Sequence, residues 1–182
     1  STDKVVEATS ILGQTKLLAE KKVMNSNLIT GSKNTAFSSV RFGNIIGSRG
    51  SVIPKFISQI KKGLPITVTD KKMTRYVMTI NNSVDLIIRA ISMMNGGEIF
   101  ILKSMGSFRI YDLALALISY YKVKKNIKII GKIRGEKINE KIYTDNEGMI
   151  LSKSNNIYII NYKPANKRKK NNHKNHRKLK IF

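Results

Sequence analysis

Residues 40–56, VRFGNIIGSRGSVIPKF, form a junction that constrains how this chain can fold. The stretch opens with an apolar, β-prone segment and then passes Gly43, Gly47 and Gly50 within eight residues. Glycines this dense mark backbone that turns sharply or lets another group come close. Helical spacing resumes after Pro54. The stretch therefore predicts a strand, a glycine-rich connection and a helix, and ligands of open α/β sheets bind beyond the carboxyl end of such a strand.

The junction also carries side chains that can donate hydrogen bonds to a ligand. These are Arg41, Asn44, Ser48, Arg49 and Ser51. A glycine cluster by itself is a weak indication of a site, and a loop whose glycines serve only to turn the chain is the alternative.

Hydrophobic periodicity predicts alternating helices and strands along the chain. Helices are expected at 10–23, 54–62, 83–94 and 107–121, and strands at 36–42, 66–68, 76–80, 99–102, 127–130 and 157–160. This alternation predicts the α/β class with a mostly parallel sheet. Thr9 or Ser10 is expected to cap the first helix, whose apolar residues are consistent with one buried face, and Asn81 or Asn82 to cap the third.

The chain is long enough for one folded domain with a real core. It has 182 residues, of which 41% are hydrophobic, an ordinary fraction for a globular protein. Residues 1–150 are expected to form this domain, and residues 151–182 an irregular segment with a basic tail. The last 20 residues lack an apolar pattern and are expected to be disordered.

The formal net charge of +23 raises the possibility of a nucleic-acid partner. The last 20 residues hold nine Lys or Arg and no acid, which leaves 25 bases against 11 acids in the rest of the chain. These charges are scattered, and the joint richness in Lys, Asn and Ile resembles a compositional bias of the source genome. Specific nucleic-acid recognition is therefore not expected, and a basic binding module at 163–180 is the alternative.

Several kinds of site are excluded by composition. The chain has no cysteine, and its two histidines, His173 and His176, lie in the tail. No metal site and no histidine-based triad are therefore expected in the folded part. No apolar run reaches the roughly 18 residues of a membrane span. Because no signal peptide is visible either, the cytoplasm is the expected compartment.

Six short motifs then occur in order along the chain. They are Ser1-Thr2-Asp3-Lys4, Gly13-x-Thr15-Lys16, Arg41-Phe42-Gly43-Asn44, Gly47-Ser48-Arg49-Gly50-Ser51-Val52-Ile53-Pro54, Met73-Thr74-Arg75-Tyr76 and Gly97-Glu98-Ile99-Phe100. Together they resemble the carboxyl-terminal half of CapD-like polysaccharide biosynthesis proteins. That family consists of extended short-chain dehydrogenase/reductases that act as UDP-N-acetylglucosamine 4,6-dehydratases or as related epimerases. The resemblance covers roughly residues 1–145 and implies an incomplete Rossmann-like fold.

The resemblance implies catalytic roles for the first motif. Such enzymes use NAD(P) to oxidise the sugar at C4 and then eliminate water across C5 and C6. Elimination requires a base for the C5 proton and an acid for the C6 hydroxyl. The resemblance places a hydroxyl, an acid and a base at Thr2, Asp3 and Lys4. Neighbouring strand residues point to opposite faces, so these three can act together only at an irregular strand end; the alternative is an ordinary turn before the helix.

The resemblance also implies residues that hold the cofactor. Lys16 matches the lysine of the family's Tyr-x-x-x-Lys pair, which is catalytic and binds the nicotinamide ribose, and Phe42 and Gly43 would lie near the nicotinamide amide. The tyrosine position holds Leu12. Leucine cannot exchange a proton, so the C4 proton transfer would fall to Thr2 or to a water. Without the resemblance, Lys16 would be an exposed helix lysine.

The substrate-binding residues implied by the resemblance are Asn44, Ser51, Val52, Pro54, Arg75 and Glu136. A cation at Arg75 is the expected complement of a diphosphate, and a solvated loop charge is the alternative. Segment 133–137, IRGEK, resembles the family's Arg-Pro-Gly-Glu-Lys, but Arg134 stands at the proline position and Ile133 at the arginine position.

The family's amino-terminal half, with the glycine-rich loop that holds NAD, has no counterpart in these residues. The chain is therefore expected to be a fragment, from a truncated gene or from a split enzyme with a separately encoded NAD-binding half, and not to bind NAD tightly alone. Faces that would pack on the missing strands are expected to be left apolar. A catalytically inactive remnant that binds a UDP-sugar or a partner subunit is the alternative, and a complete member would be a homo-oligomer.

Overall fold

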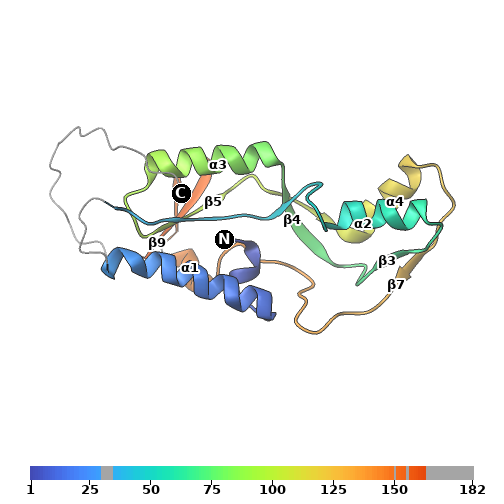
Figure 1. Ribbon diagram of the computed structural model, residues 1–182, viewed down its shortest axis with the longest axis horizontal. Coiled ribbons are helices and arrows are strands. Elements are labelled where there is room, and N and C mark those ends of the chain that lie inside the picture. Colours follow the sequence, from blue (N-terminus) through green and yellow to red (C-terminus); the bar gives the residue numbers. More distant parts are fainter. Residues whose placement is uncertain (30–34, 150, 155, 163–182) are drawn as a thin grey trace.

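The computed structural model describes residues 1–29, 35–149, 151–154 and 156–162. Figure 1 shows two groups of elements, one around α1, α3 and β5 and one around α2, α4 and β3. In chain order the elements are η1 (Asp3–Val5), α1 (Ile11–Ile29), β1 (Ser39–Arg41), β2 (Asn44–Ile45), α2 (Val52–Lys61), β3 (Ile66–Val68), β4 (Thr74–Met78), α3 (Ile80–Met93), β5 (Glu98–Leu102), β6 (Gly106–Arg109), α4 (Ile110–Tyr120), β7 (Ile127–Ile129), α5 (Asp145–Met149), β8 (Leu151–Ser154) and β9 (Ile157–Asn161).

The first group is built on a four-stranded sheet in the order β1-β5-β9-β8. Every residue of β5 is buried. Phe100 of this strand packs in one cluster with Leu86 of α3, whereas Ile101 packs in another with Met24 of α1. Because alternate residues of a strand face opposite sides, α3 and α1 cover opposite faces of the sheet, as Figure 1 shows. This double coverage explains the continuous apolar run of β5.

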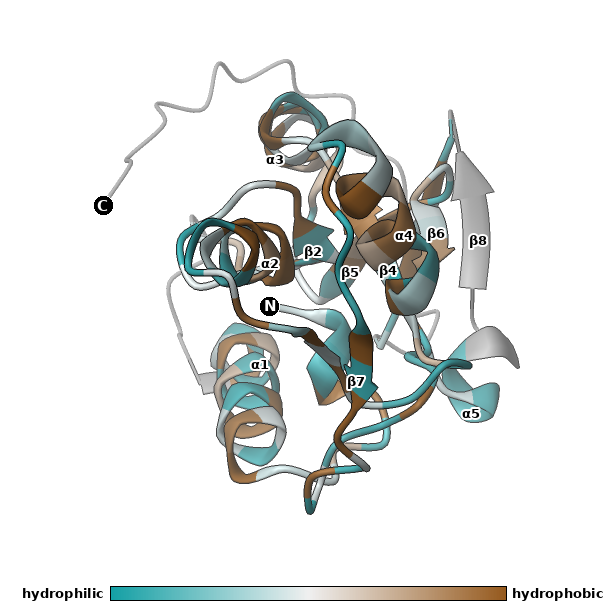
Figure 2. Cartoon of the chain, turned by 90° about the vertical axis from the view of Figure 1, so that its right-hand side faces the viewer, coloured by the Kyte–Doolittle hydropathy of each residue, from teal (hydrophilic) through white to brown (hydrophobic). Residues whose placement is uncertain are grey.

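The second group contains two small sheets, β2-β4-β6 and β3-β7. Helices α2 and α4 pack against each other and against β3, and Figure 2 views the molecule from this end. The buried residues of its core are Phe56, Ile60, Ile66, Val68, Met73, Ile110 and Ala114. Strand β4 belongs to this group and pairs with β2, which immediately follows the β1 end of the first sheet. The glycine-rich junction therefore lies between the two cores.

Two of the three described sheets are mixed, so the predicted mostly parallel sheet is wrong. The pairs β1–β5, β2–β4 and β3–β7 are parallel, whereas β5–β9, β8–β9 and β4–β6 are antiparallel. The helix expected from residue 107 begins at Ile110, because residues 106–109 pair with β4 instead. Hydrophobic spacing cannot reveal a pairing partner that lies thirty residues away in the chain.

The predicted N-cap of α1 is confirmed, whereas the predicted N-cap of α3 is wrong. The Ser10 hydroxyl accepts a hydrogen bond from the Gly13 amide at 3.1 Å, as expected for a cap of α1. For α3 the expected asparagine caps are wrong. The helix begins at Ile80, and the Thr79 hydroxyl accepts from the Asn82 amide at 3.1 Å. Both asparagines are instead part of its first turn.

Helix α1 leaves much of its apolar surface uncovered. Ile11, Leu18 and Leu28 are 82%, 71% and 82% exposed, whereas Glu20 and Met24 are buried. The expected single buried apolar face is therefore wrong, because the apolar residues are distributed around the helix, as Figure 2 shows.

The sheet continues past residue 150, since β9 pairs along its whole length with β5. This agrees with the expected strand at 157–160. The tail at 163–182, predicted to be disordered, lies outside the described residues. None of the helices in the described part of the chain has the length and apolar character needed to cross a membrane.

Candidate active site

The backbone passes from an extended strand into a 3-10 turn at the first motif. Thr2 is extended and forms a parallel bridge with Phe42, and the Asp3 amide donates to the Phe42 carbonyl at 2.8 Å. The next residues form the 3-10 turn η1, closed by the Val5 amide on the Thr2 carbonyl. Because the strand ends here, the side chains no longer alternate between opposite faces. The motif thus occupies the irregular strand end that a shared catalytic role requires.

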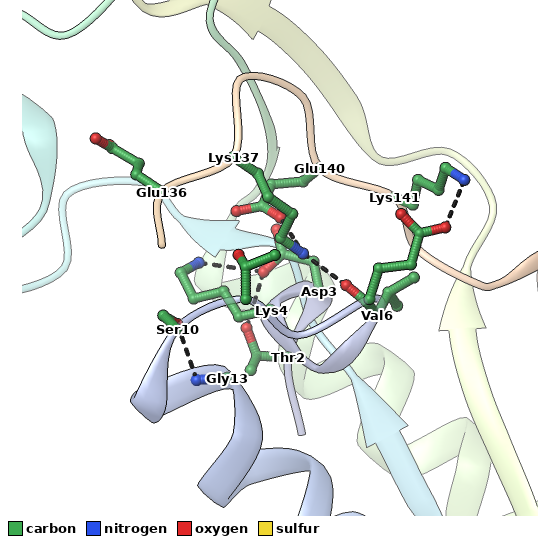
Figure 3. Close-up of polar contacts among 12 residues, drawn as sticks. Thr2, Asp3, Lys4, Val6, Ser10, Gly13, Glu136, Lys137, Glu140 and Lys141 are labelled. Carbon is green, nitrogen blue, oxygen red and sulfur yellow. Dashed lines mark hydrogen bonds and ion pairs between the residues drawn. The ribbon is translucent and has the colours of Figure 1, made fainter. Parts of the chain in front are cut away.

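Three of the four side chains implied to be catalytic form one connected group. The Asp3 Oδ1 atom accepts hydrogen bonds from Thr2 Oγ1 at 2.9 Å and from Lys4 Nζ at 3.2 Å. Asp3 is fully buried, and its Oδ2 atom has no hydrogen-bond partner among the described residues. Figure 3 shows Thr2, Asp3 and Lys4 directed toward one another. A buried carboxylate with one free oxygen and two adjacent donors is suited to proton transfer.

Lys4 connects this group to the glycine-rich junction. Its Nζ atom donates to Asn44 Oδ1 at 3.2 Å, and Asn44 Nδ2 in turn donates to the Tyr76 carbonyl at 3.1 Å. Asn44 is held in place by the close approach of Gly43 to β4. A Cβ atom at Gly43 would lie 3.0 Å from Tyr76 Cβ, so a larger residue would push the two strands apart. The glycine thus serves close approach, as its position in the sequence suggested.

The other junction glycines serve the turn. Gly47 and Gly50 both have φ of +75°, in the left-handed region that favours glycine. The turn delivers the chain to Ser51, the N-cap residue of α2.

A cleft lies between the junction, α2 and β4. It has a volume of about 320 Å³. Of the residues implied to bind substrate, it is lined by Asn44, Ser51, Val52, Arg75 and Glu136. Residues from positions 44 to 136 of the chain thus meet in one cavity. Pro54 is exposed and is not among the described residues that line it.

Arg75 places a guanidinium in this cleft. Its side chain is 13% exposed, and Nη1 donates to the carbonyls of Thr74 at 2.7 Å and Ile138 at 3.1 Å. Its Nη2 atom lies 3.5 Å from Glu136 Oε1, and its Nε atom lies 3.9 Å from Glu140 Oε1. The backbone contacts fix the orientation of the side chain, and its guanidinium borders the cleft.

Other polar side chains of the cleft were not predicted from the sequence, among them Lys55, Thr67 and Thr69. Lys55 follows Ser51 at a helical spacing of four, which places both on one side of α2. That spacing was the feature of the sequence that could have indicated Lys55 as a cleft residue. The threonines lie on or just after β3, and nothing in their local sequence indicates that β3 borders the cleft.

Lys16 is not among the described residues that line the cleft. It is exposed on α1 and lines a separate hollow of about 240 Å³ together with Ser1, Thr2 and Ser39. Phe42, the backbone partner of Thr2, is half-buried next to Gly43. Thr2 is therefore the residue that links the hollow to Asp3 and Lys4. Leu12, one turn before Lys16, is 58% exposed.

Arg41 does not supply a donor to the junction, contrary to the expectation from sequence. It is 2% exposed, and its Nη2 atom lies 2.7 Å from Glu20 Oε1 and 3.0 Å from Glu147 Oε1. The Tyr162 hydroxyl also donates to Glu147. Arg41 is thus a buried clamp that ties β1 to α1 and α5. Its partners come from distant parts of the chain, so no local pattern predicts them.

The electrostatics of this clamp favour its charged form. Burial alone would raise the pKa of Glu147, but hydrogen bonds from Arg41, from Tyr162 and from the Thr144 backbone outweigh it and lower the pKa to about 2. Burial and the hydrogen bond to Glu147 together raise the pKa of Tyr162. The clamp therefore remains an ion pair at neutral pH.

Solved structures with the same fold define the class of protein. Pen from Bacillus thuringiensis superposes with a TM-score of 0.83 at 41% identity, covering 88% of this chain and 51% of Pen. The dTDP-glucose 4,6-dehydratase DesIV from Streptomyces venezuelae, solved with NAD, superposes with a TM-score of 0.66 at 15% identity, covering 82% of this chain and 47% of DesIV. The fold is that of the extended short-chain dehydrogenase/reductases, of which this chain covers a part.

Sequence relatives then identify the family. Residues 1–162 match the family described as polysaccharide biosynthesis protein, and the chain belongs to it. It is 44% identical over 167 residues to an uncharacterized membrane protein of Methanocaldococcus jannaschii, covering 88% of this chain and 50% of that protein. It is 42% identical over 150 residues to the capsular polysaccharide biosynthesis protein CapD of Staphylococcus aureus, with coverage of 81% and 25%.

A further relative has a named reaction. The chain is 39% identical over 163 residues to the inverting UDP-N-acetylglucosamine 4,6-dehydratase of Campylobacter jejuni, covering 88% of this chain and 47% of the enzyme. The chain thus spans about half the length of the archaeal and Campylobacter relatives and a quarter of CapD. The predicted family is confirmed.

Proposed function

We propose that this chain supplies two parts of a 4,6-dehydratase or 4-epimerase of surface polysaccharide biosynthesis, whose substrate is a UDP-N-acetylglucosamine-type sugar. One part is the acid–base turn, which consists of Thr2, Asp3, Lys4 and the rest of η1. The other part is the cleft, which binds the nucleotide sugar. The observation that carries this proposal is the hydrogen bond from Lys4 to Asn44. Asn44 lines the cleft that also contains Arg75, so this hydrogen bond joins the Thr2-Asp3-Lys4 group to a residue of the cleft lining. The named reaction of the Campylobacter relative supports the same chemistry.

The proposed acid and base exchange one proton with each other. In the structure Lys4 and Asp3 form an ion pair with 3.2 Å between Nζ and Oδ1. Movement of one proton across this contact gives a neutral amine and a carboxylic acid. The amine then removes the C5 proton of a 4-keto sugar, while the acid protonates the C6 hydroxyl, which leaves as water. Both groups return to the ion pair, so the step balances and restores the site.

NAD, when bound, supplies the oxidation at C4 that makes the C5 proton acidic. The residues of this chain that would hold it are Lys16, Phe42 and Gly43, at the nicotinamide end. The hollow beside Lys16 fits this role because Ser1 Oγ is buried there without a hydrogen-bond partner among the described residues. The sequence has no glycine-rich phosphate loop that could hold the other end. The chain alone is therefore expected to bind NAD weakly, and micromolar binding in calorimetry would contradict this.

The substrate is proposed to lie across the cleft. Arg75 would contact the diphosphate, Glu136 the ribose hydroxyls and Asn44 the sugar. Ser51, Val52 and the neighbouring Pro54 would border the uracil and ribose. Ser51 Oγ is buried and has no hydrogen-bond partner among the described residues, so it is free to bind a ligand.

A catalytically inactive protein that binds a UDP-sugar or a partner subunit is the second candidate. Leu12 favours it, because an exposed leucine stands where the family carries its tyrosine and cannot exchange a proton. The altered loop also favours it, because Ile133 stands at the family's arginine position and the exposed Arg134 is not among the described residues that line the cleft.

Two measurements separate these candidates. The first mixes the chain with an NAD-binding amino-terminal half and UDP-N-acetylglucosamine, and follows formation of a 4-keto-6-deoxy sugar by NMR. The second titrates UDP into the chain alone and into an Arg75→Met variant, with Arg134→Met as the control for charge. Arg75-dependent UDP binding with no product supports the inactive protein. Absence of both product and Arg75-dependent binding would overturn the dehydratase or epimerase and also the inactive protein that binds a UDP-sugar.

A further inference from the structure

Segment 135–141 lies against the acid–base turn. The Thr9 hydroxyl donates to the Gly135 carbonyl at 2.7 Å. The Lys137 Nζ atom donates to the Val6 carbonyl at 2.6 Å. Val6 is the residue that caps the 3-10 turn η1, since its own amide donates to the Asp3 carbonyl. Lys137 therefore holds the end of the turn that carries the proposed acid and base, as Figure 3 shows.

The same segment also lies against β4. The Thr74 amide donates to the Ile138 carbonyl at 3.0 Å, and the Thr74 hydroxyl donates to Asn139 Oδ1 at 2.8 Å. The Arg75 guanidinium donates to the Ile138 carbonyl as well. Segment 135–141 thus bridges the strand that bears the cleft arginine and the turn that bears Lys4.

Glu140 joins the two sides electrostatically. Its side chain is only 4% exposed, with Oε2 at 3.0 Å from Lys137 Nζ and Oε1 at 3.9 Å from Arg75 Nε. A buried carboxylate needs cationic partners, and removal of one partner leaves an uncompensated charge. Loss of the Lys137 ammonium would therefore draw the Arg75 guanidinium toward Glu140 and away from the cleft.

We infer that Lys137 is a positioning residue for this site, and that through Glu140 it fixes the position of the Lys4 turn relative to Arg75. Lys137 is 17% exposed, is directed at Val6 and Glu140, and is not among the described residues that line the cleft. It acts through the backbone of the turn and through a shared carboxylate. The significance of this arrangement for catalysis rests on the proposed function, whereas the arrangement itself can be tested without turnover.

The chain contains a matched control in the same segment. Lys141 Nζ lies 2.6 Å from Glu7 Oε1, so it too connects segment 135–141 to the residues after η1. Both side chains of that pair are about half exposed. Exposed ion pairs contribute little to stability. Lys141→Met removes the same charge at a nearby position without removing a partner of Val6 or of Glu140.

Hydrogen–deuterium exchange of the full chain tests the inference. In Lys137→Met, exchange of the amides in 3–6 is expected to accelerate by about tenfold, since Val6 loses a fixed contact. Exchange in 74–76 should accelerate as well, because the Arg75 guanidinium moves toward Glu140. Lys141→Met should leave both segments unchanged, and Lys137→Arg should restore slow exchange. Unchanged exchange in Lys137→Met, or equal acceleration in Lys141→Met, would overturn the positioning role.

Two additions keep the test decisive. If circular dichroism shows that Lys137→Met does not fold, Glu140→Gln replaces it. In this variant the amides of 74–76 should exchange faster, whereas those of 3–6 should not, because Lys137 still donates to the Val6 carbonyl. The reverse pattern would refute the inference. In the protein mixed with its amino-terminal half, Lys137→Met should lower kcat about tenfold with a smaller change in KM. If the unsubstituted mixture forms no product, the proposed function fails, while the exchange result still decides the role of Lys137.

Discussion

The ammonium of Lys4 lies 3.2 Å from the side-chain oxygen of Asn44, a residue 40 positions later in the chain. Asn44 is fixed in turn by the Tyr76 carbonyl, next to Arg75. The proposed base is thereby connected through one amide to the strand that carries the cleft cation. This connection joins the proposed proton-transfer group to the lining of the cleft that contains Arg75.

Lys4→Met is expected to remove the base while keeping most of the side-chain volume. In the mixture with the amino-terminal half, kcat should fall by about 10²- to 10⁴-fold, the usual contribution of a positioned general base. Product formation followed by NMR gives the measurement. Lys132→Met, at an exposed lysine, is the control and should retain full activity, and equal losses in both variants would argue against a specific role for Lys4.

Gly13→Ala tests how tightly α1 packs on the acid–base turn. Alanine in a helix interior is normally about 1 kcal/mol more favourable than glycine. Here the new Cβ atom would lie 2.6 Å from the Lys4 carbonyl oxygen, so the turn or the helix must shift. The variant should be destabilised by about 1–3 kcal/mol, as overpacked sites are.

Urea unfolding measures the effect of Gly13→Ala, with Gly106→Ala as the control because its nearest neighbour would be 3.5 Å away. A stabilised Gly13→Ala variant would mean that this contact does not constrain the turn.

Arg41→Met should destabilise the fold far more than the removal of an exposed cation. It leaves Glu20 and Glu147 buried without their shared cation, and breaking a buried pair in this way costs about 3–5 kcal/mol. Arg109→Met removes an exposed pair with Asp112 and should cost less than about 1 kcal/mol. Chemical denaturation of both variants distinguishes them, and similar midpoints would contradict the clamp.

The stability of the fold should decrease in acid because of Glu147. Hydrogen bonds lower the pKa of this carboxyl from 4.5 to about 2. A group with a depressed pKa in the folded state stabilises the fold above its unfolded pKa, and that stability is lost as pH falls toward the folded pKa. The free energy of unfolding should therefore drop by on the order of 2–3 kcal/mol between about pH 5 and pH 2 through this group.

Urea titrations at a series of pH values check this dependence. In Glu147→Gln the same decrease should be smaller by the contribution of Glu147, because the amide does not titrate. If the free energy of unfolding falls by the same amount in the variant as pH is lowered, other groups account for the loss of stability in acid.

Much of the local structure was predictable from the sequence. The strand at 66–68 and the Ser10 cap follow from alternation and from capping chemistry, which depend on neighbours in the chain. The antiparallel pairing of residues 106–109 and the burial of Arg41 were not predictable, because both depend on partners that are remote in sequence.

The site shows the same division. The motifs name Thr2, Asp3, Lys4, Asn44 and Arg75, and their order along the chain is enough to indicate the family. They do not indicate that Lys55 lines the same cleft or that Lys137 holds the end of the turn.

The sequence by itself determined which functional groups the chain contains. It has a hydroxyl, an acid and a base in succession, glycines where the backbone must turn or approach closely, and no thiol. Only the tertiary structure decided which of these groups meet. Propensity and capping act over a few residues, whereas the Lys4–Asn44 and Lys137–Val6 contacts join segments 40 and 131 positions apart. Such contacts form only when two cores pack around the junction and bring distant backbone together.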